Sequence, residues 1–373
     1  MARIFIVFGT RPEAIKMAPV VKAFVADPAF ETIVCVTGQH RSMLDQALEL
    51  FDIKPDIDLD IMQPGQTLAN VTTATLNGLD TLFSENRPDA VLVHGDTTTA
   101  MAAALAAFYR QIPVGHVEAG LRTGNLAAPW PEEMNRRFID MVSRWLFAPT
   151  ETSAAALQNE GVEDERITVT GNTVIDALLS VSEELRHDPD RTALLDKKFA
   201  FLDQQKRLIV VTGHRRENFD GGLERMCHAL AQLATRGDVE IVYPVHLNEN
   251  VQRAASAVLE DTSGIHLIDP QDYLPFVYLM DRADLLISDS GGIQEEAPSL
   301  GKPVLVTRDV TERPEAITAG TCRLVGTCTE TIVAEAEKLL DDPDEYARVS
   351  AITNPYGDGH AAPRIVEAMK NAI

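Results

Sequence analysis

The sequence predicts an α/β protein built from two Rossmann-like, doubly wound domains with a ligand cleft between them. Apolar runs rich in branched residues alternate with helical patterns, as in parallel sheets that are covered on both faces. The pattern restarts after residue 171, and 373 residues exceed what one core usually holds. Polar turns follow most of the apolar runs, at the sheet edge where such proteins bind ligands.

Four strand patterns make up the first half of the chain. We expect them at residues 4–8, 32–37, 90–94 and 113–117. Pro12 and Glu13 suit the first turn of a helix after the first strand. An alanine-rich helix should span residues 98–109, between the third and fourth strands.

Five further strand patterns make up the second half. We expect them at residues 208–212, 240–243, 266–268, 284–288 and 303–307. Helical patterns close the chain, and a break at residues 354–357 would let the last helix turn back onto the first domain. The expected domains are residues 1–171 plus 355–373, with catalytic carboxylates, and residues 172–354.

Composition and charge restrict the partners. A formal net charge of -23 argues against nucleic acid or a membrane as the partner. No run is long enough to span a bilayer, and the four cysteines lack zinc-type spacing, so we expect a reduced, cytoplasmic protein. Dinucleotide-binding, P-loop and α/β-hydrolase motifs are absent from the sequence. We therefore expect no cofactor and no metal.

The segment at residues 285–298 predicts a site for a nucleotide diphosphate. An apolar strand pattern ends in a Ser/Gly turn, and a helical pattern follows. Free N–H groups at a helix start attract anions, and Gly291 and Gly292 would let a phosphate approach the backbone. Glu296 would repel phosphate, so we expect it to face the hydroxyl groups of a ribose. The alternative is an ordinary strand–turn–helix connection.

Carboxylates follow two consecutive strands of the first half. Asp96 and Glu118 would lie on one rim of the sheet, where such a pair can act as acid and base. Asp96 could instead cap the alanine-rich helix. Glu132 has an ordinary explanation in helix-start chemistry beside Pro131. The buried stripe of that helix is expected from Met134, Phe138, Met141, Val142 and Trp145.

Histidine and arginine residues follow other strands. His214 lies between Gly213 and two arginines, whose charge would lower its pKa. His246 makes a weaker case of the same kind. Arg11 and Arg313 could clamp a phosphate, although a solvated salt bridge is the alternative for each.

Together these motifs resemble the bacterial non-hydrolysing UDP-N-acetylglucosamine 2-epimerases over essentially the whole chain. The matching segments are FGTRPEAIK at residues 8–16, HGDTTT at 94–99, GHVEAGLRT at 115–123, PEE at 131–133, TGHRRE at 212–217 and SDSGGIQEE at 288–296. The resemblance implies a two-domain glycosyltransferase B-type fold, with UDP in the interdomain cleft and bound by the second domain, and a homodimer. It implies an isomerase that interconverts UDP-N-acetylglucosamine and UDP-N-acetylmannosamine through 2-acetamidoglucal, for cell-surface polysaccharide.

The resemblance also assigns roles to residues. It makes Asp96, Glu118, Glu132 and His214 catalytic. Substrate-binding residues by the same pattern are Arg11, Lys16, Gln271, Phe276, Ser290, Gly291, Gly292, Glu296 and Arg313. Some members are activated by a second UDP-N-acetylglucosamine, and the matching positions here are Gln39, Glu133, Arg215 and His246. The alternative hypotheses are a glycosyltransferase of the same fold, which would need an acceptor, and a nucleotide-sugar sensor without activity.

Overall fold

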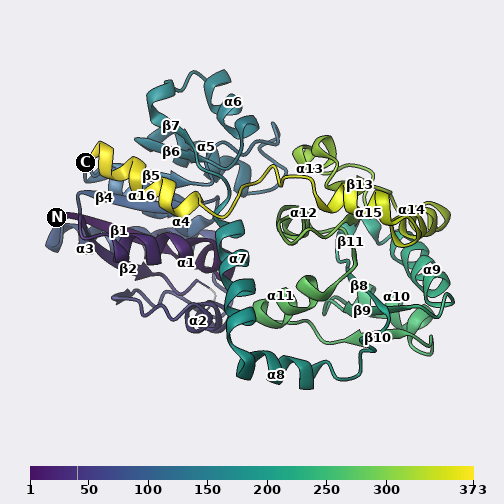
Figure 1. Cartoon of the computed structure of the whole chain (residues 1–373). Coiled ribbons are helices and arrows are strands. Elements are labelled where there is room, and N and C mark those ends of the chain that lie inside the picture. Colours follow the sequence, from purple (N-terminus) through teal and green to yellow (C-terminus); the bar gives the residue numbers. More distant parts are fainter. Residues whose placement is uncertain (40) are drawn as a thin grey trace. The chain divides into compact units, whose positions relative to one another are not determined.

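The chain folds into two compact units, each built around one parallel sheet (Figure 1). The computed structural model describes residues 1–39 and 41–373. Unit 1 comprises Met1–Ala177 and Tyr356–Ile373, and unit 2 comprises Leu178–Pro355. The predicted class, an α/β protein with two doubly wound parallel sheets, is confirmed.

The sheet of unit 1 has seven strands in the order β3-β2-β1-β4-β5-β6-β7. Its strands are β1 (Ala2–Phe8), β2 (Phe30–Val36), β3 (Ile57–Asp58), β4 (Ala90–His94), β5 (Val114–Val117), β6 (Trp145–Ala148) and β7 (Ile167–Val169). The strands β3, β6 and β7 had not been predicted. The order reverses between β1 and β4, and such a switch point is where ligands bind in this class of fold.

Helices cover both faces of this sheet. They are α1 (Arg11–Ala26), α2 (Arg41–Leu50), α3 (Leu68–Glu85), α4 (Thr98–Tyr109), α5 (Glu132–Val142), α6 (Glu151–Asn159), the 3-10 turn Asp164–Arg166, and α16 (Ala361–Ala372). The helix α7 (Thr173–His187) begins in unit 1 and continues into unit 2. The C-terminal helix α16, drawn in yellow, packs against α1, and Lys370 pairs with Asp27 at 3.0 Å (Figure 1).

The core of unit 1 explains the alanine-rich sequence of α4. Ala100, Ala103 and Ala107 are fully buried in the cluster that contains Phe5 and Phe83. The rings of Phe5 and Phe83 meet edge to face, with centroids 5.7 Å apart. Side chains this small let α4 contact β1, β4 and β5 while it also packs against α3 and α5.

The sheet of unit 2 has six parallel strands in the order β10-β9-β8-β11-β12-β13. Its strands are β8 (Arg207–Thr212), β9 (Val239–Pro244), β10 (Ile265–Ile268), β11 (Leu285–Ser288), β12 (Val304–Val306) and β13 (Cys322–Leu324). The switch point lies between β8 and β11. The predicted residue His214 and the segment 289–292 therefore follow the two strands that form this switch point.

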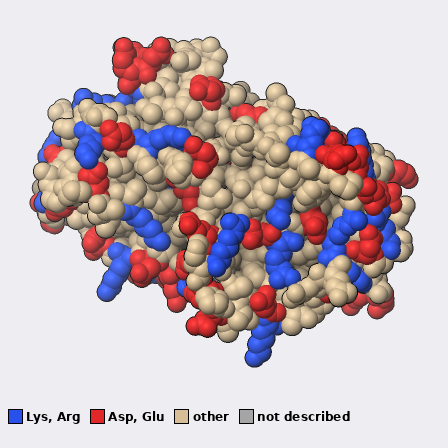
Figure 2. All heavy atoms as spheres, in the orientation of Figure 1, with Lys and Arg blue, Asp and Glu red and all other residues tan. Residues whose placement is uncertain are grey.

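Helices also flank the sheet of unit 2. They are α8 (Pro189–Lys198), α9 (Gly222–Ala234), α10 (Glu249–Leu259), α11 (Tyr273–Arg282), α12 (Gly291–Glu296), α13 (Pro314–Ala319), α14 (Thr329–Asp341) and α15 (Pro343–Ser350), with 3-10 turns at Arg216–Asn218 and Ala297–Leu300. The face shown in Figure 2 mixes basic and acidic side chains, without one continuous basic surface. Across residues 1–39 and 41–373, no helix is long and apolar enough to cross a bilayer.

Candidate active site

The turn after β1 is organised by the buried carboxylate of Glu13. Thr10 caps α1, and Glu13 Oε2 accepts hydrogen bonds from the amides of Gly9 at 3.1 Å and Thr10 at 2.8 Å. The hydroxyl of Thr97 donates to Glu13 Oε1 at 2.7 Å, which ties the turn after β4 to the turn after β1. Burial raises the pKa of Glu13 to about 7, although these hydrogen bonds favour its ionised form.

Glu118 follows β5 with its backbone in the left-handed region, at φ 69°. A residue with a side chain is strained there, by about 1–3 kcal/mol. The carboxylate is almost buried and forms an ion pair with Lys16 of α1. Asn172 Nδ2 donates to the same oxygen at 3.1 Å, and His94 Nε2 lies 3.7 Å from the other oxygen. An ammonium and an amide donor both stabilise an ionised Glu118.

His94 ends β4 and is buried beside this carboxylate. Neither ring nitrogen has a hydrogen-bond partner within the described part of the chain. Burial lowers the pKa of His94 to about 3, and the nearby charge of Lys16 acts in the same direction, whereas Glu118 raises it. The ring is therefore neutral in the folded protein at neutral pH.

This low pKa makes an acid-dependent loss of stability an expected result. Below its ordinary pKa of 6.5, His94 binds a proton when unfolded but not when folded, so the free energy of unfolding falls with pH toward about 3. His94→Phe should remove part of that loss, on the order of a few kcal/mol. Urea unfolding at several pH values measures it, with His228→Phe on the exposed face of α9 as control. Parallel curves for the wild type and His94→Phe would contradict it.

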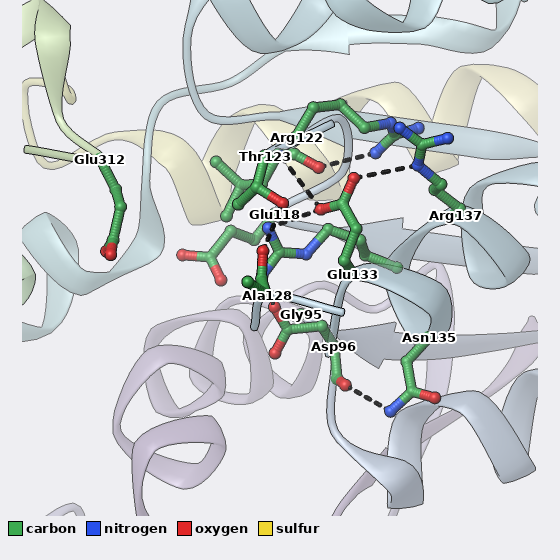
Figure 3. A network of polar contacts seen from close by, with 12 residues as sticks. Gly95, Asp96, Glu118, Arg122, Thr123, Ala128, Glu133, Asn135, Arg137 and Glu312 are labelled. Carbon is green, nitrogen blue, oxygen red and sulfur yellow. Dashed lines mark hydrogen bonds and ion pairs between the residues drawn. The ribbon is translucent and has the colours of Figure 1, made fainter. Parts of the chain in front are cut away.

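Asp96 follows β4, and two residues of α5 hold it in place. Arg136 forms an ion pair with its carboxylate, and Asn135 Nδ2 donates to its carbonyl at 2.8 Å (Figure 3). The suggestion that Asp96 caps α4 was wrong, because Thr97 is the N-cap and accepts from the amide of Ala100. The side chain of Asp96 is thus left for another task.

The helix α5 presents polar residues to the interior. Its buried residues are Glu133, Asn135, Ile139 and Asp140. The predicted stripe was wrong in part, since Met134 is 45% and Met141 is 69% exposed. Polar side chains take the buried positions because each has partners there. Glu132 begins α5 and is partly exposed.

Glu133 holds the loop that precedes α5. Its carboxylate is fully buried and accepts from the amides of Thr123 at 3.1 Å and Gly124 at 3.3 Å. Figure 3 shows it pointing toward Thr123 and Arg137, and Arg137 Nε donates to it at 3.0 Å. Of the other predicted residues in unit 1, Arg11 begins α1, and Gln39 accepts from the hydroxyl of Thr99 at 2.8 Å.

In unit 2, the buried carboxylate of Asp289 organises the turn after β8. Its Oδ2 accepts from the amides of His214 at 2.9 Å and Arg215 at 2.8 Å. The ring of His214 stacks on that of His246, with centroids 5.2 Å apart. The pKa of His214 is lowered, first by burial and then by the charges of His246 and Arg215, while Asp289 opposes this. The predicted direction is confirmed, but burial is the larger cause.

Gly291 and Gly292 begin α12 beside arginine side chains. A methyl group built on Gly291 would lie 3.7 Å from the guanidinium of Arg313 and 3.9 Å from that of Arg215. Neither glycine has a positive φ, and the added atom would make only ordinary contacts. The protein's own packing therefore does not require glycine here, which fits a space kept for a ligand.

The two glutamates of this segment have different partners. Glu295 is buried and forms an ion pair with Arg313. Glu296 accepts a hydrogen bond from the hydroxyl of Tyr273 at 2.8 Å. The remaining predicted residues in unit 2 lie near α11: Phe276 within it, and Gln271 just before it, donating to the carbonyl of Asp269.

The structure thus places Asp96 and Glu118 after neighbouring strands of unit 1, and it brings arginine, histidine and glycine residues together in unit 2. Sequence reasoning had not singled out Asn172, Asp289 or Tyr273. Only Asp289 left a usable signal, because it directly follows a strand.

The chain matches the model of the UDP-N-acetylglucosamine 2-epimerase family over residues 22–370. It is 58% identical to the UDP-N-acetylglucosamine 2-epimerase of Escherichia coli K12, over 99% of this chain and 98% of that protein. The structure resembles the Neisseria meningitidis UDP-GlcNAc 2-epimerase bound to UDP-GlcNAc, with a TM-score of 0.90 and 49% identity over 99% and 100% of the two chains. It also resembles the Methanocaldococcus jannaschii enzyme in complex with UDP-GlcNAc and UDP, with a TM-score of 0.79 and 31% identity over 99% of each chain.

Proposed function

This chain belongs to the UDP-N-acetylglucosamine 2-epimerase family, and on that premise we propose that it inverts C2 of UDP-N-acetylglucosamine by eliminating and re-adding UDP. The product is UDP-N-acetylmannosamine, which supplies mannosamine-type sugars for cell-surface polysaccharide. The observation that carries the proposal is Glu118, which pairs with Lys16 at the strand end next to the one that bears Asp96.

Elimination solves the main chemical difficulty of the reaction. The proton at C2 of the sugar is not acidic, because no carbonyl is conjugated to that carbon. When the C1–O bond breaks, UDP leaves with the bonding electrons and C1 becomes electron-poor. A base then removes the C2 proton and the C1–C2 double bond forms, giving 2-acetamidoglucal. Proton delivery to the opposite face of C2 and return of UDP to C1 complete the epimerisation.

The carboxylates of unit 1 handle the proton. A change of configuration needs one group to remove it and another to return it from the opposite face. Asp96, Glu118 and Glu132 supply three candidates, and Lys16 with Asn172 keeps Glu118 ionised and ready to accept a proton. The sequence predicted Lys16 as a ligand of the diphosphate, whereas in the structure its ammonium pairs with Glu118.

The cluster of unit 2 holds UDP. Arg313 and Arg215 lie at the position where Gly291 leaves room for a phosphate. Glu296 binds the ribose hydroxyls, oriented by Tyr273, and Gln271 and Phe276 contact the uracil. Stabilising the charge that builds on the departing diphosphate lowers the barrier to elimination. His214 assists at the same group, as a neutral hydrogen-bond donor.

Turnover in deuterated water tests this function. Product and recovered substrate should both carry deuterium at C2, because the abstracted proton exchanges with solvent before it returns. The measurement is an NMR time course with UDP-N-acetylglucosamine as the only sugar. Unlabelled product would exclude elimination. Free N-acetylmannosamine would indicate a hydrolase, and no reaction without an acceptor would favour a glycosyltransferase or a sensor.

Two properties of the assembly belong to the same proposal. The chain forms a homodimer, which accounts for the exposed Phe108 and Tyr109 of α4 and the exposed Met134 and Met141 of the adjoining α5. A second UDP-N-acetylglucosamine activates it through Gln39, Glu133, Arg215 and His246. Light scattering reports the first property, and a sigmoidal dependence of rate on substrate concentration reports the second.

A further inference from the structure

His116, the second residue of the motif at residues 115–123, has a ring that is fully buried between two oxygen atoms. Its Nδ1 lies 2.6 Å from Asp140 Oδ1, and its Nε2 lies 2.7 Å from the carbonyl oxygen of Gly95. Asp140, on the buried face of α5, is 2% exposed. Neither residue reaches a surface where it could touch a substrate.

The two contacts together require a proton on each ring nitrogen of His116. A carbonyl oxygen only accepts, so Nε2 must donate to Gly95. Asp140 is ionised, because its second oxygen also faces Arg122 at 2.7 Å and the amide of Gly120 at 3.2 Å. Nδ1 must therefore donate as well, and the ring is an imidazolium.

This ion pair contacts both turns that carry the acid and base candidates. Through Gly95, which has a φ of 64°, His116 fixes the residue before Asp96. Through Gly120, Asp140 fixes the turn that begins with the strained Glu118. Gly120 packs closely against the next segment, because an added methyl group there would lie 2.3 Å from the carbonyl oxygen of Ser153. Strained residues persist where surrounding contacts fix them in this way.

We propose that His116 and Asp140 are positioning residues of the epimerase, and that a buried imidazolium–carboxylate pair sets the relative placement of the Asp96 and Glu118 turns. The opposite charges make the hydrogen bonds to the Gly95 carbonyl and from the Gly120 amide stronger than neutral groups would, and the pair does not exchange protons with the sugar. This inference rests on the proposed role of Asp96 and Glu118 in epimerisation.

Asp140→Asn is the sharpest test because it keeps the shape and every hydrogen bond. The new amide would donate to a neutral Nδ1, its oxygen would accept from Gly120 and Arg122, and Nε2 would still donate to Gly95. Only the charges are lost. We expect kcat to fall about 10–100-fold, the size of loss seen when the partner that orients a metal-bound histidine is removed. The KM for UDP-N-acetylglucosamine and the number of UDP molecules bound per chain should change less than about twofold, because UDP is held by unit 2.

Asp80→Asn is the matched control, since Asp80 pairs with Arg110 through both oxygens at the surface of the same unit. It should keep the wild-type kcat. A wild-type kcat in Asp140→Asn would overturn the proposal. So would a decrease in kcat that is matched by an equal decrease in the number of UDP molecules bound per chain, because the variant would then only be partly unfolded. If Glu118→Gln and Asp96→Asn also keep full activity, the proposed function itself fails; if they are inactive, only this inference fails.

The protonation of His116 is tested on the unaltered protein, whether or not Asp140→Asn folds. Nitrogen-15 NMR should show one histidine with protons on both ring nitrogens, absent from the spectrum of His116→Gln. The same ring should become neutral in Asp140→Asn. A neutral His116 ring in the wild type would overturn the proposal.

Discussion

Glu118→Gln is expected to lower kcat by about 10³-fold, within the range that general acid–base catalysis contributes. The amide keeps the size of the side chain and can still accept from Asn172 and Lys16, but it cannot take a proton from C2. UDP should bind with wild-type affinity, because its proposed ligands lie in unit 2. Steady-state rates, C2 deuterium exchange and UDP titration measure the three effects on one preparation.

The matched control is Glu160→Gln. Glu160 lies in the same unit and pairs with Arg122 at 2.8 Å, with 40% of its side chain exposed. It should leave kcat unchanged. If Glu118→Gln exchanges the C2 proton at the wild-type rate, another carboxylate is the base, and Asp96→Asn and Glu132→Gln would identify it.

Local sequence patterns were sufficient to predict the fold class and most of the strand ends. Buried parallel strands are continuous apolar runs, and the residues after them must lie at one edge of the sheet. Asp96, Glu118 and His214 were found in this way. Asn172 was not, because it reaches Glu118 across 54 residues of chain, and no local rule relates the two.

The helix α5 shows where periodicity fails. Its methionines suggested a buried stripe, yet the interior face carries Glu133, Asn135 and Asp140. Hydrophobic spacing assumes that polar residues avoid the core, whereas Glu133 and Asp140 are buried because Thr123, Gly124, His116 and Arg122 satisfy them. Their partners lie on β5 and its following loop, and only the folded chain brings the two segments together.

Arg313→Ala is expected to raise the Kd for UDP about 10²-fold, equivalent to about 3 kcal/mol. The guanidinium lies where Gly291 leaves room for a phosphate, and it can donate two parallel hydrogen bonds there. The variant should also lower kcat, because this interaction strengthens as charge builds on the departing diphosphate. Calorimetric titration with UDP and steady-state kinetics separate the two effects.

Arg313→Lys separates the effect of charge from that of geometry, because it keeps a cation beside Glu295 but loses the planar guanidinium. Its Kd for UDP should lie between those of the wild type and Arg313→Ala. Arg236→Ala is the matched control, since Arg236 pairs with Asp238 and Asp341 at the surface of unit 2. It should bind UDP normally. If Arg313→Ala is folded and binds UDP as tightly as the wild type, the diphosphate does not lie beside Gly291. The glycines of that turn would then need another explanation, because neither their φ angles nor the packing around them requires glycine.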